Sequence, residues 1–165
     1  MPRLIQLLLK VLVPSALLSI GFIKEFVFVN MNYRISSVYH NSNSYELPFP
    51  IDFLNSCDYS TLYYLKFFFT FLWIISYFIL SLICVKIFFN KKQYIKLVFI
   101  SYLIIILASL ILFTTLLITT DYNTAYQPTR KIIELVESPI VIMTLFPLFF
   151  FMDSFEKHKN DEKRQ

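Results

Sequence analysis

Four apolar runs, each about as long as a membrane helix, limit what this 165-residue chain can fold into. The hydrocarbon core of a bilayer is about 30 Å thick, and a helix needs roughly 20 apolar residues to cross it. All four runs exceed strand length and lack the alternation of a barrel strand. They cover residues 4–23, 67–89, 97–118 and 132–152. The pattern predicts an all-α integral membrane protein, a bundle of four transmembrane helices forming one domain over residues 1–165.

The composition leads to the same class of protein. Apolar residues make up 57% of the chain and charged residues 16%, whereas globular proteins average about 45–50% and 25%. A soluble domain this small exposes too much of its surface to hide so many apolar side chains from water. Much of the chain is therefore expected to be surrounded by the lipid bilayer, which is its first expected binding partner.

The basic residues beside the apolar runs predict how the helices cross the bilayer. Cytoplasmic loops of membrane proteins carry an excess of Lys and Arg. With four passes, one side holds Arg3, the lysine-rich link 90–96 and the tail 153–165, and this side carries the excess. We therefore expect both termini and this tail in the cytoplasm. The segments 24–66 and 119–131 then face outward.

The first apolar run is the weakest of the four. Lys10 and Pro14 interrupt it, and Ser19 and Gly21 are small residues spaced like a signal-peptide cleavage site. Whether this run is a cleaved signal peptide stays open from sequence. Its loss would leave three passes without changing the other assignments.

The outward segment 24–66 is rich in aromatic residues and contains a turn-forming stretch with Pro48 and Pro50. Tyrosine rings prefer the headgroup level of a membrane, and such prolines block helix formation. We expect an aromatic cap that packs on the bundle at the outer face of the membrane, with a partner-docking surface as the alternative. Asp58 or Ser60 is the predicted N-cap of the second helix.

Charged residues at the start of the fourth run are the candidate functional residues. Glu134 and Glu137 are three residues apart and share a helix face with Arg130, beside Lys131. We interpret these four residues as a charged patch at the outer end of the helix, available to a partner protein. Because carboxylates within membranes mark ion pathways, the alternative is an ion- or proton-coupled transporter that uses Glu134 and Glu137.

No catalytic, cofactor-binding or metal-binding site is predicted. The two histidines, His40 and His158, are expected on opposite sides of the membrane, and Cys57 and Cys84 have no metal-ligand spacing. The single glycine, Gly21, excludes a glycine-rich phosphate loop, and no nucleic-acid motif appears. The chain is therefore expected not to be an enzyme, with a site built on Cys57 as the remote alternative.

Three features within residues 60–152 carry a family resemblance. Tyr64–Lys66 leads into an aromatic-rich helix, and the lysine-rich turn Lys91–Lys96 enters a helix containing Ser101–Leu103. Pro139 and Pro147 enclose seven apolar-rich residues and are followed by aromatic ones. In this pattern the chain resembles the exosortase-associated small integral membrane proteins of Bacteroidota, of the types linked to exosortase X or exosortase F.

The resemblance implies an accessory protein of the bacterial inner membrane that acts near a sortase-like transpeptidase for surface proteins. It carries over no active-site residues. The chain departs from the pattern where Glu134 and Glu137 intervene between the basic pair and the apolar core, which leaves the subtype open. We therefore expect a non-enzymatic multi-pass accessory or scaffold protein, whose partners are other integral membrane proteins, an exosortase among them.

Overall fold

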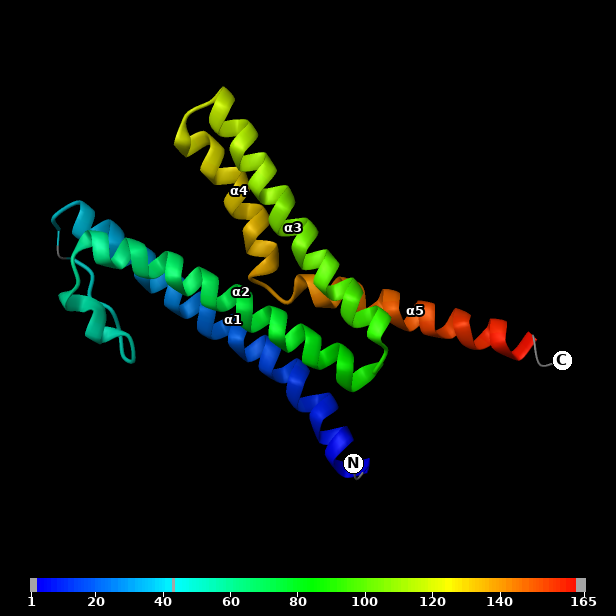
Figure 1. Cartoon of the computed structure of the whole chain (residues 1–165). Helices are drawn as coiled ribbons and strands as arrows, with labels where there is room; N and C mark the ends of the chain where they lie inside the picture. The colour runs from blue at the N-terminus through cyan, green and yellow to red at the C-terminus, as the bar shows by residue number, and fades with distance from the viewer. Residues whose placement is uncertain (1–2, 43, 163–165) are drawn as a thin grey trace.

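The chain is helical throughout most of its length in the structure, a computed structural model (Figure 1). The structure describes the backbone of residues 3–42 and 44–162 and the side chains of residues 7–42, 44–122 and 124–156. The elements are α1 (Arg3–Tyr39), the short 3-10 helix η1 (Asp52–Ser56), α2 (Tyr59–Phe88), α3 (Lys92–Thr119), α4 (Tyr122–Val136) and α5 (Ile140–Glu162). This described part contains no β-strand, so the all-α prediction is confirmed there.

Three helices, α1, α2 and α3, are each long and apolar enough to cross a membrane by length and composition. The shorter α4 and α5 meet this criterion only when they are counted together as one bent span. The structure therefore has three to four candidate spans, which agrees with the membrane class that the four apolar runs predict.

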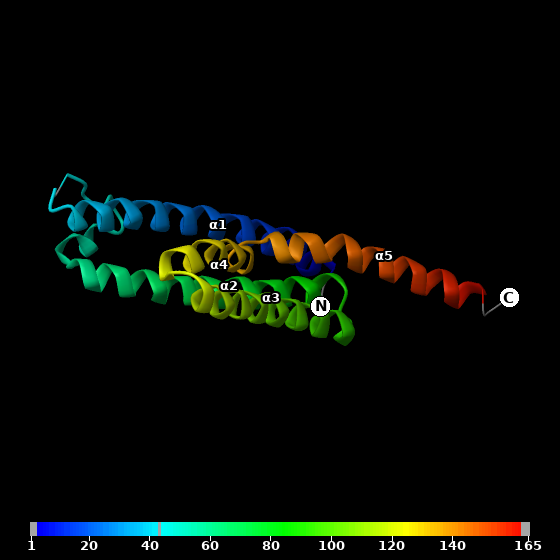
Figure 2. The same ribbon diagram turned by 90° about the horizontal axis from the view of Figure 1, so that it is seen from above.

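Two antiparallel helix hairpins share one end of the molecule (Figures 1 and 2). The α1 helix packs along α2, and α3 packs along α4, while a short turn joins α2 to α3. The hairpins diverge from this turn, and α5 leaves the end of α4 toward the same side as the N-terminus (Figure 1). We call the end with the α2–α3 turn and both termini the tail end. The opposite end, with the α1–α2 loop and the α3–α4 turn, is the cap end.

An asparagine in the left-handed conformation makes the α2–α3 turn short. Asn90 has a φ of 50°, and its N–H donates a hydrogen bond of 3.3 Å to the carbonyl of Val85. Asparagine tolerates this conformation, which commonly ends helices. The new helix begins at Lys92, so most of the link expected at residues 90–96 is the first turn of α3.

Aromatic rings and an ionic contact fasten α5 to this turn. The ring of Phe89 meets Tyr94 and Phe149 edge to face, and the rings of Tyr94 and Phe149 stack with centroids 4.7 Å apart. The ammonium of Lys91 lies 2.5 Å from Asp153 and 2.6 Å from Glu156. These hydrogen bonds, that to Asp153 first, raise the pKa of Lys91 above the ordinary lysine value. The predicted cytoplasmic tail begins at residue 153. In the structure, α5 continues through this region as far as Glu162.

The main core joins buried side chains from all five α-helices. Between α2 and α3, the hydroxyls of Ser81 and Tyr102 form a buried hydrogen bond of 3.0 Å. Between α1 and α2, a Cβ added at Gly21 would lie 3.2 Å from the hydroxyl oxygen of Tyr77, so the two helices approach closely there. Small residues allow such approaches between membrane helices.

The predicted extent of the outward loop, 24–66, is wrong. The α1 helix continues to Tyr39 and α2 begins at Tyr59, so the described residues of this segment that lie outside α-helix are 40–42 and 44–58. No proline or glycine stops α1 within this stretch. Val27, Met31 and Arg34 are buried at helical spacing. Packing against α2 thus keeps residues 24–39 helical, although their polar side chains suggest a loop.

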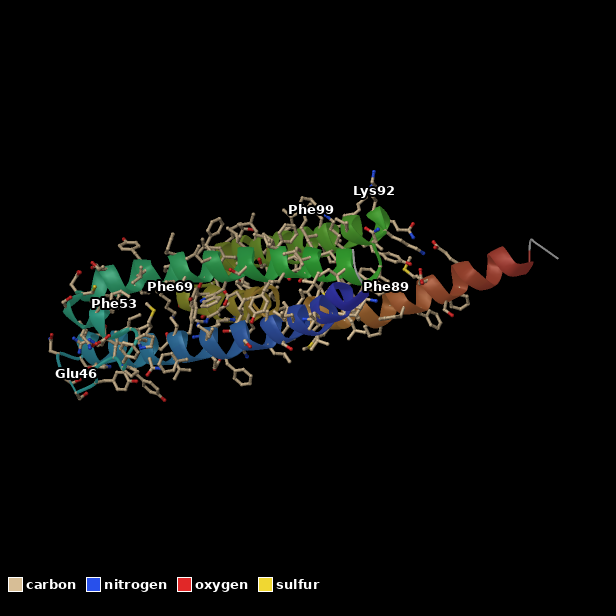
Figure 3. All side chains as sticks on the ribbon, turned by 90° about the horizontal axis from the view of Figure 1, so that it is seen from below. Glu46, Phe53, Phe69, Phe89, Lys92 and Phe99 are labelled. Carbon is tan, nitrogen blue, oxygen red and sulfur yellow. The ribbon has the colours of Figure 1, made fainter. Side chains whose placement is uncertain are left out.

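Residues 40–58 form a cap on the end of the α1–α2 hairpin, as Glu46 and Phe53 show in Figure 3. A second core lies beneath the cap, and its buried members are Val27, Met31, Leu47, Ile51, Leu54 and Leu62. All of them come from α1, the cap or α2. The segment is therefore packed, as expected, although it covers one hairpin rather than the whole bundle.

Asp58, the last residue before α2, is the N-cap residue of that helix, one of the two predicted positions. Asp58 has the extended backbone conformation of an N-cap. Its carboxylate accepts a hydrogen bond from the hydroxyl of Thr61, and this bond lowers the pKa of Asp58.

The fourth predicted helix, 132–152, is broken in two. The α4 helix ends at Val136, α5 begins at Ile140, and the two are bent by 50°. Pro139 has no N–H to donate and disfavours helical geometry at the residue before it. Pro147 lies within α5 without ending it. Of the two prolines in this run, only Pro139 therefore interrupts the helix.

Candidate functional site

Five charged residues from α1, α2, α4 and the break after α4 gather on the cap side of the main core. We call them the charged cluster, and they are Lys24, Lys66, Arg130, Glu134 and Glu137. Lys24 directly follows the first apolar run, Lys66 directly precedes the second, and Arg130 lies just before the fourth. The fold therefore brings three cations together at the level where three apolar runs begin or end.

A buried ion pair joins α1 to the break between α4 and α5. The ammonium of Lys24 lies 2.9 Å from the Glu137 carboxylate, and the two side chains are 14% and 6% exposed. The same ammonium donates a hydrogen bond of 3.0 Å to the backbone carbonyl of Glu137. Carbonyls at the end of a helix lack partners within it. One lysine thus satisfies both the carboxylate and a backbone group at the broken point of the helix.

The second ion pair lies within α4. The Nε of Arg130 is 3.1 Å from Glu134, and its Nη1 donates a hydrogen bond of 3.1 Å to the hydroxyl of Tyr126. The Glu134 side chain is 50% exposed. Lys131 is exposed and makes no ion pair with a described side chain.

The four residues of the predicted patch therefore divide between two surroundings. Arg130 and Glu134 pair as expected, and Lys131 lies beside them on the outside of α4. Glu137 turns inward to Lys24 rather than to Arg130 or Lys131.

Lys66 is the cation of the cluster that lacks a carboxylate partner. It is half-buried on α2 and forms no ion pair or hydrogen bond with a described residue. With Arg130, Glu137, Tyr63 and Tyr126 it lines a small cavity of about 90 Å³ between the helices. The charged cluster holds three cations and two carboxylates, so its formal charge is +1.

Sequence reasoning missed two members of this cluster. Lys24 and Lys66 fall in the segment expected to be an outer loop, where a lysine indicates only orientation. Lys66 is an isolated lysine next to apolar residues in "YYLKFFF", and Lys24 stands beside Glu25 in the otherwise apolar stretch "GFIKEFVFV". A charge beside membrane segments is expected to have a partner, and this signal would have placed both lysines in the candidate site.

A site built on Cys57 would draw on Arg34 of the same outer segment, but Arg34 has a structural role. Arg34 is buried, and its guanidinium donates hydrogen bonds of 2.8 Å to the carbonyl of Tyr45 and 2.7 Å to that of Asn55. Cys57 and Cys84 are free thiols. Within the described residues, no three His, Cys, Asp or Glu side chains are placed to hold a metal ion. The side chain of His158 lies outside the described residues.

Comparison of the chain with family models, curated proteins and solved structures finds no match. Its function is therefore argued from the geometry of the charged cluster and from the surface of α4.

Proposed function

We propose that this chain is a non-enzymatic, multi-pass accessory protein of the bacterial inner membrane that binds other integral membrane proteins laterally. The observation that carries the proposal is a polar stripe along the outside of α4, formed by Gln127, Lys131 and Glu134. These residues recur at intervals of four and three, so they share one face, and all three are exposed.

A polar stripe on a helix that borders the apolar region offers polar groups to a partner helix. Charged and amide side chains are costly against lipid tails, and membrane proteins place them against one another. The opposite face of α4 buries Ala125, Thr129 and Val136 within the protein, so the stripe is left for a neighbouring molecule. A partner helix with complementary polar groups would satisfy it, and the family resemblance suggests an exosortase as that partner.

The proposed orientation places the cap end outside the cell and both termini in the cytoplasm. Support comes from the lysines that gather at the tail end, which include Lys86, Lys91, Lys92 and Lys96. An excess of basic residues in short loops marks the cytoplasmic side.

Reversing the charge of Arg130 and Lys131 together is expected to weaken the association. In the Arg130→Glu/Lys131→Glu variant, Glu134 and any acidic group of the partner would face like charges, which we expect to lower recovery of a co-expressed exosortase about tenfold. The measurement is the amount of exosortase recovered from detergent-solubilised membranes with the tagged chain. Carbonate extraction should show unchanged membrane insertion.

A matched control reverses two exposed acidic residues of the cap, Glu46→Lys/Asp52→Lys, and should leave recovery unchanged. The single Lys131→Glu variant, which leaves the pairing of Arg130 with Glu134 intact, should show part of the effect. Equal recovery from the wild type and the Arg130→Glu/Lys131→Glu variant would make the patch a simple membrane anchor and overturn the proposal.

The second candidate function is an ion- or proton-coupled transporter. The break beside Glu137 favours it, because transporters use broken helices and buried carboxylates at their binding sites. Flux through proteoliposomes that disappears in the Glu134→Gln/Glu137→Gln variant would support this function. No flux from the wild type, together with stable capture of an exosortase, would support the accessory role.

A further inference from the structure

We infer that a groove between α1, α2 and α5 holds one acyl chain of an anionic phospholipid from the leaflet at the tail end, and that Lys10 binds the phosphate of this lipid. The inference does not depend on the accessory role. It rests on the apolar lining of the groove, on the cation at its tail-end mouth and on its length along the helices.

The groove exists because the helices around it diverge. The α1 helix packs along α2, whereas the backbone of α5 hardly approaches either of them. The chain bends by 50° at the break around Pro139, where α5 begins. A hollow of about 300 Å³ is left between the three helices, and the rings of Phe88 and Phe146, which both line it, meet with centroids 4.8 Å apart.

The groove suits a hydrocarbon chain. Its lining consists of apolar side chains and the thiol of Cys84. Leu18 of α1 and Met143 of α5 line it and are 50% and 53% exposed, so the groove is open along its side. An unfilled groove loses dispersion contacts along its walls. In a bilayer, the molecules beside it that can restore these contacts are lipid acyl chains.

Lys10 places a cation at the tail-end mouth of the groove. It lies four residues before Pro14 and seven before Leu17, so it shares with them the face of α1 that lines the groove. Its ammonium is 5.7 Å from the centre of the Phe88 ring, close enough for a cation–π contact. Side chains lean toward the start of their helix. The start of α1 lies at the tail end, beside the end of α2 (Figure 3), so Lys10 reaches toward the headgroups.

The ammonium of Lys10 is available to a ligand. It forms no ion pair with a described residue. The carboxylates of Asp153 and Glu156 at the tail end are bound by Lys91. A lipid phosphate at the mouth of the groove would give Lys10 an anionic partner through a charge-assisted hydrogen bond.

The length and direction of the groove match one leaflet. Lys10 and Leu18 are eight residues apart, or about 12 Å along α1, and Pro139 and Pro147 are separated by the same number on α5. Half of the hydrocarbon core measures about 15 Å. The mouth lies beside Phe88, the last residue of α2, where hydrocarbon gives way to headgroups. From this mouth an acyl chain runs toward Pro139 and the middle of the bilayer.

The charges at the tail end favour an anionic headgroup over a zwitterionic one. Lysines beside transmembrane helices bind anionic headgroups. The phosphate of phosphatidylglycerol carries one negative charge without a compensating cation, and it would pair with Lys10. The choline of phosphatidylcholine would instead meet a region that also carries Lys86, Lys91 and Lys92.

The test compares ligands on the wild-type chain, purified in mild detergent and stripped of lipid. Phosphatidylglycerol should raise the melting temperature and appear as one bound lipid per chain in native mass spectrometry. Phosphatidylcholine with the same acyl chains should bind at least fivefold more weakly, and glycerol 3-phosphate, which has no acyl chain, should give no shift. Equal binding of phosphatidylcholine would show a general lipid contact, and an equal shift with glycerol 3-phosphate would show a simple anion site. Either result would overturn the inference.

Variants then locate the site. Lys10→Gln should bind phosphatidylglycerol at least fivefold more weakly, and Lys10→Arg should largely retain binding. Met143→Trp, which fills the groove and leaves every charge in place, should also weaken binding. Two matched controls should bind as the wild type does: Lys86→Gln removes an exposed lysine of α2 that does not line the groove, and Leu12→Trp enlarges an exposed leucine outside it.

Wild-type binding by Lys10→Gln or by Met143→Trp would overturn the inference. Neither residue belongs to the polar stripe on α4, so this result is separate from the partner test.

Discussion

Replacing Lys24 with methionine is expected to lower the free energy of unfolding by about 3–5 kcal/mol, because it leaves the buried carboxylate of Glu137 without a partner. Lys24 lies 2.9 Å from that carboxylate and also binds the Glu137 backbone carbonyl. Methionine keeps much of the length and apolar character of the lysine side chain, so the charge is the main change. Denaturant unfolding in mixed detergent micelles measures the loss.

Two further variants separate the ion pair from packing. The double variant Lys24→Met/Glu137→Gln carries no unpaired charge, so we expect it to recover most of the stability that Lys24→Met loses. Lys131→Met changes an exposed lysine and should alter stability by at most about 0.5 kcal/mol. If Lys24→Met unfolds like the wild type, the ion pair does not join α1 to the break between α4 and α5.

Replacing Arg34 with methionine is the second change expected to have a large effect. Arg34 is buried under the cap and binds the carbonyls of Tyr45 and Asn55, which lie at the two ends of the cap. Its loss would leave two partly buried carbonyls without these donors, at a cost of up to about 1–3 kcal/mol each. The cap should open while the helices remain packed. Limited proteolysis should therefore cut between residues 41 and 56, with far-UV circular dichroism little changed.

The control for this prediction keeps the charge and changes the geometry. Arg34→Lys has a single ammonium in place of two nitrogens that each bind a different carbonyl, so it should protect the cap only in part. Full protection of the cap in Arg34→Met would show that its apolar core, with Leu47 and Leu54, holds it in place without the arginine.

The helix content and the apolar spans were predictable because they depend on local features. A run of about 20 apolar residues has few structural solutions in lipid, and each of the four runs falls, to within a residue, on α1, α2, α3 or the bent pair α4–α5. Pro139 and Pro147 both signal a kink in the sequence, and the structure has a break at Pro139 while Pro147 lies within α5. The extent of the break and its bend depend on packing against other helices, which no local pattern encodes.

Only the local part of the charged cluster was predictable, because contacts between distant segments depend on how the helices pack. Arg130 and Glu134 are four residues apart on one helix, so their pairing follows from helical periodicity. Lys24 and Glu137 are 113 positions apart and meet only because the α1–α2 hairpin packs beside α4. The length of α1 was missed similarly, since the residues after Lys24 are held helical by their contacts with α2 and the cap.

Cysteine labelling tests most directly how the helices cross the membrane. Single cysteines introduced in a chain that lacks Cys57 and Cys84 can be labelled with a membrane-impermeant maleimide, before and after cell lysis. The positions are Glu46 in the cap, Lys92 at the α2–α3 turn and Ser154 in α5, all exposed. We predict that only the cysteine at 46 is labelled in intact spheroplasts, and that those at 92 and 154 react only after lysis. Labelling of the cysteine at 154 in intact spheroplasts would contradict the account, because α4 and α5 would then form a re-entrant loop instead of a final crossing.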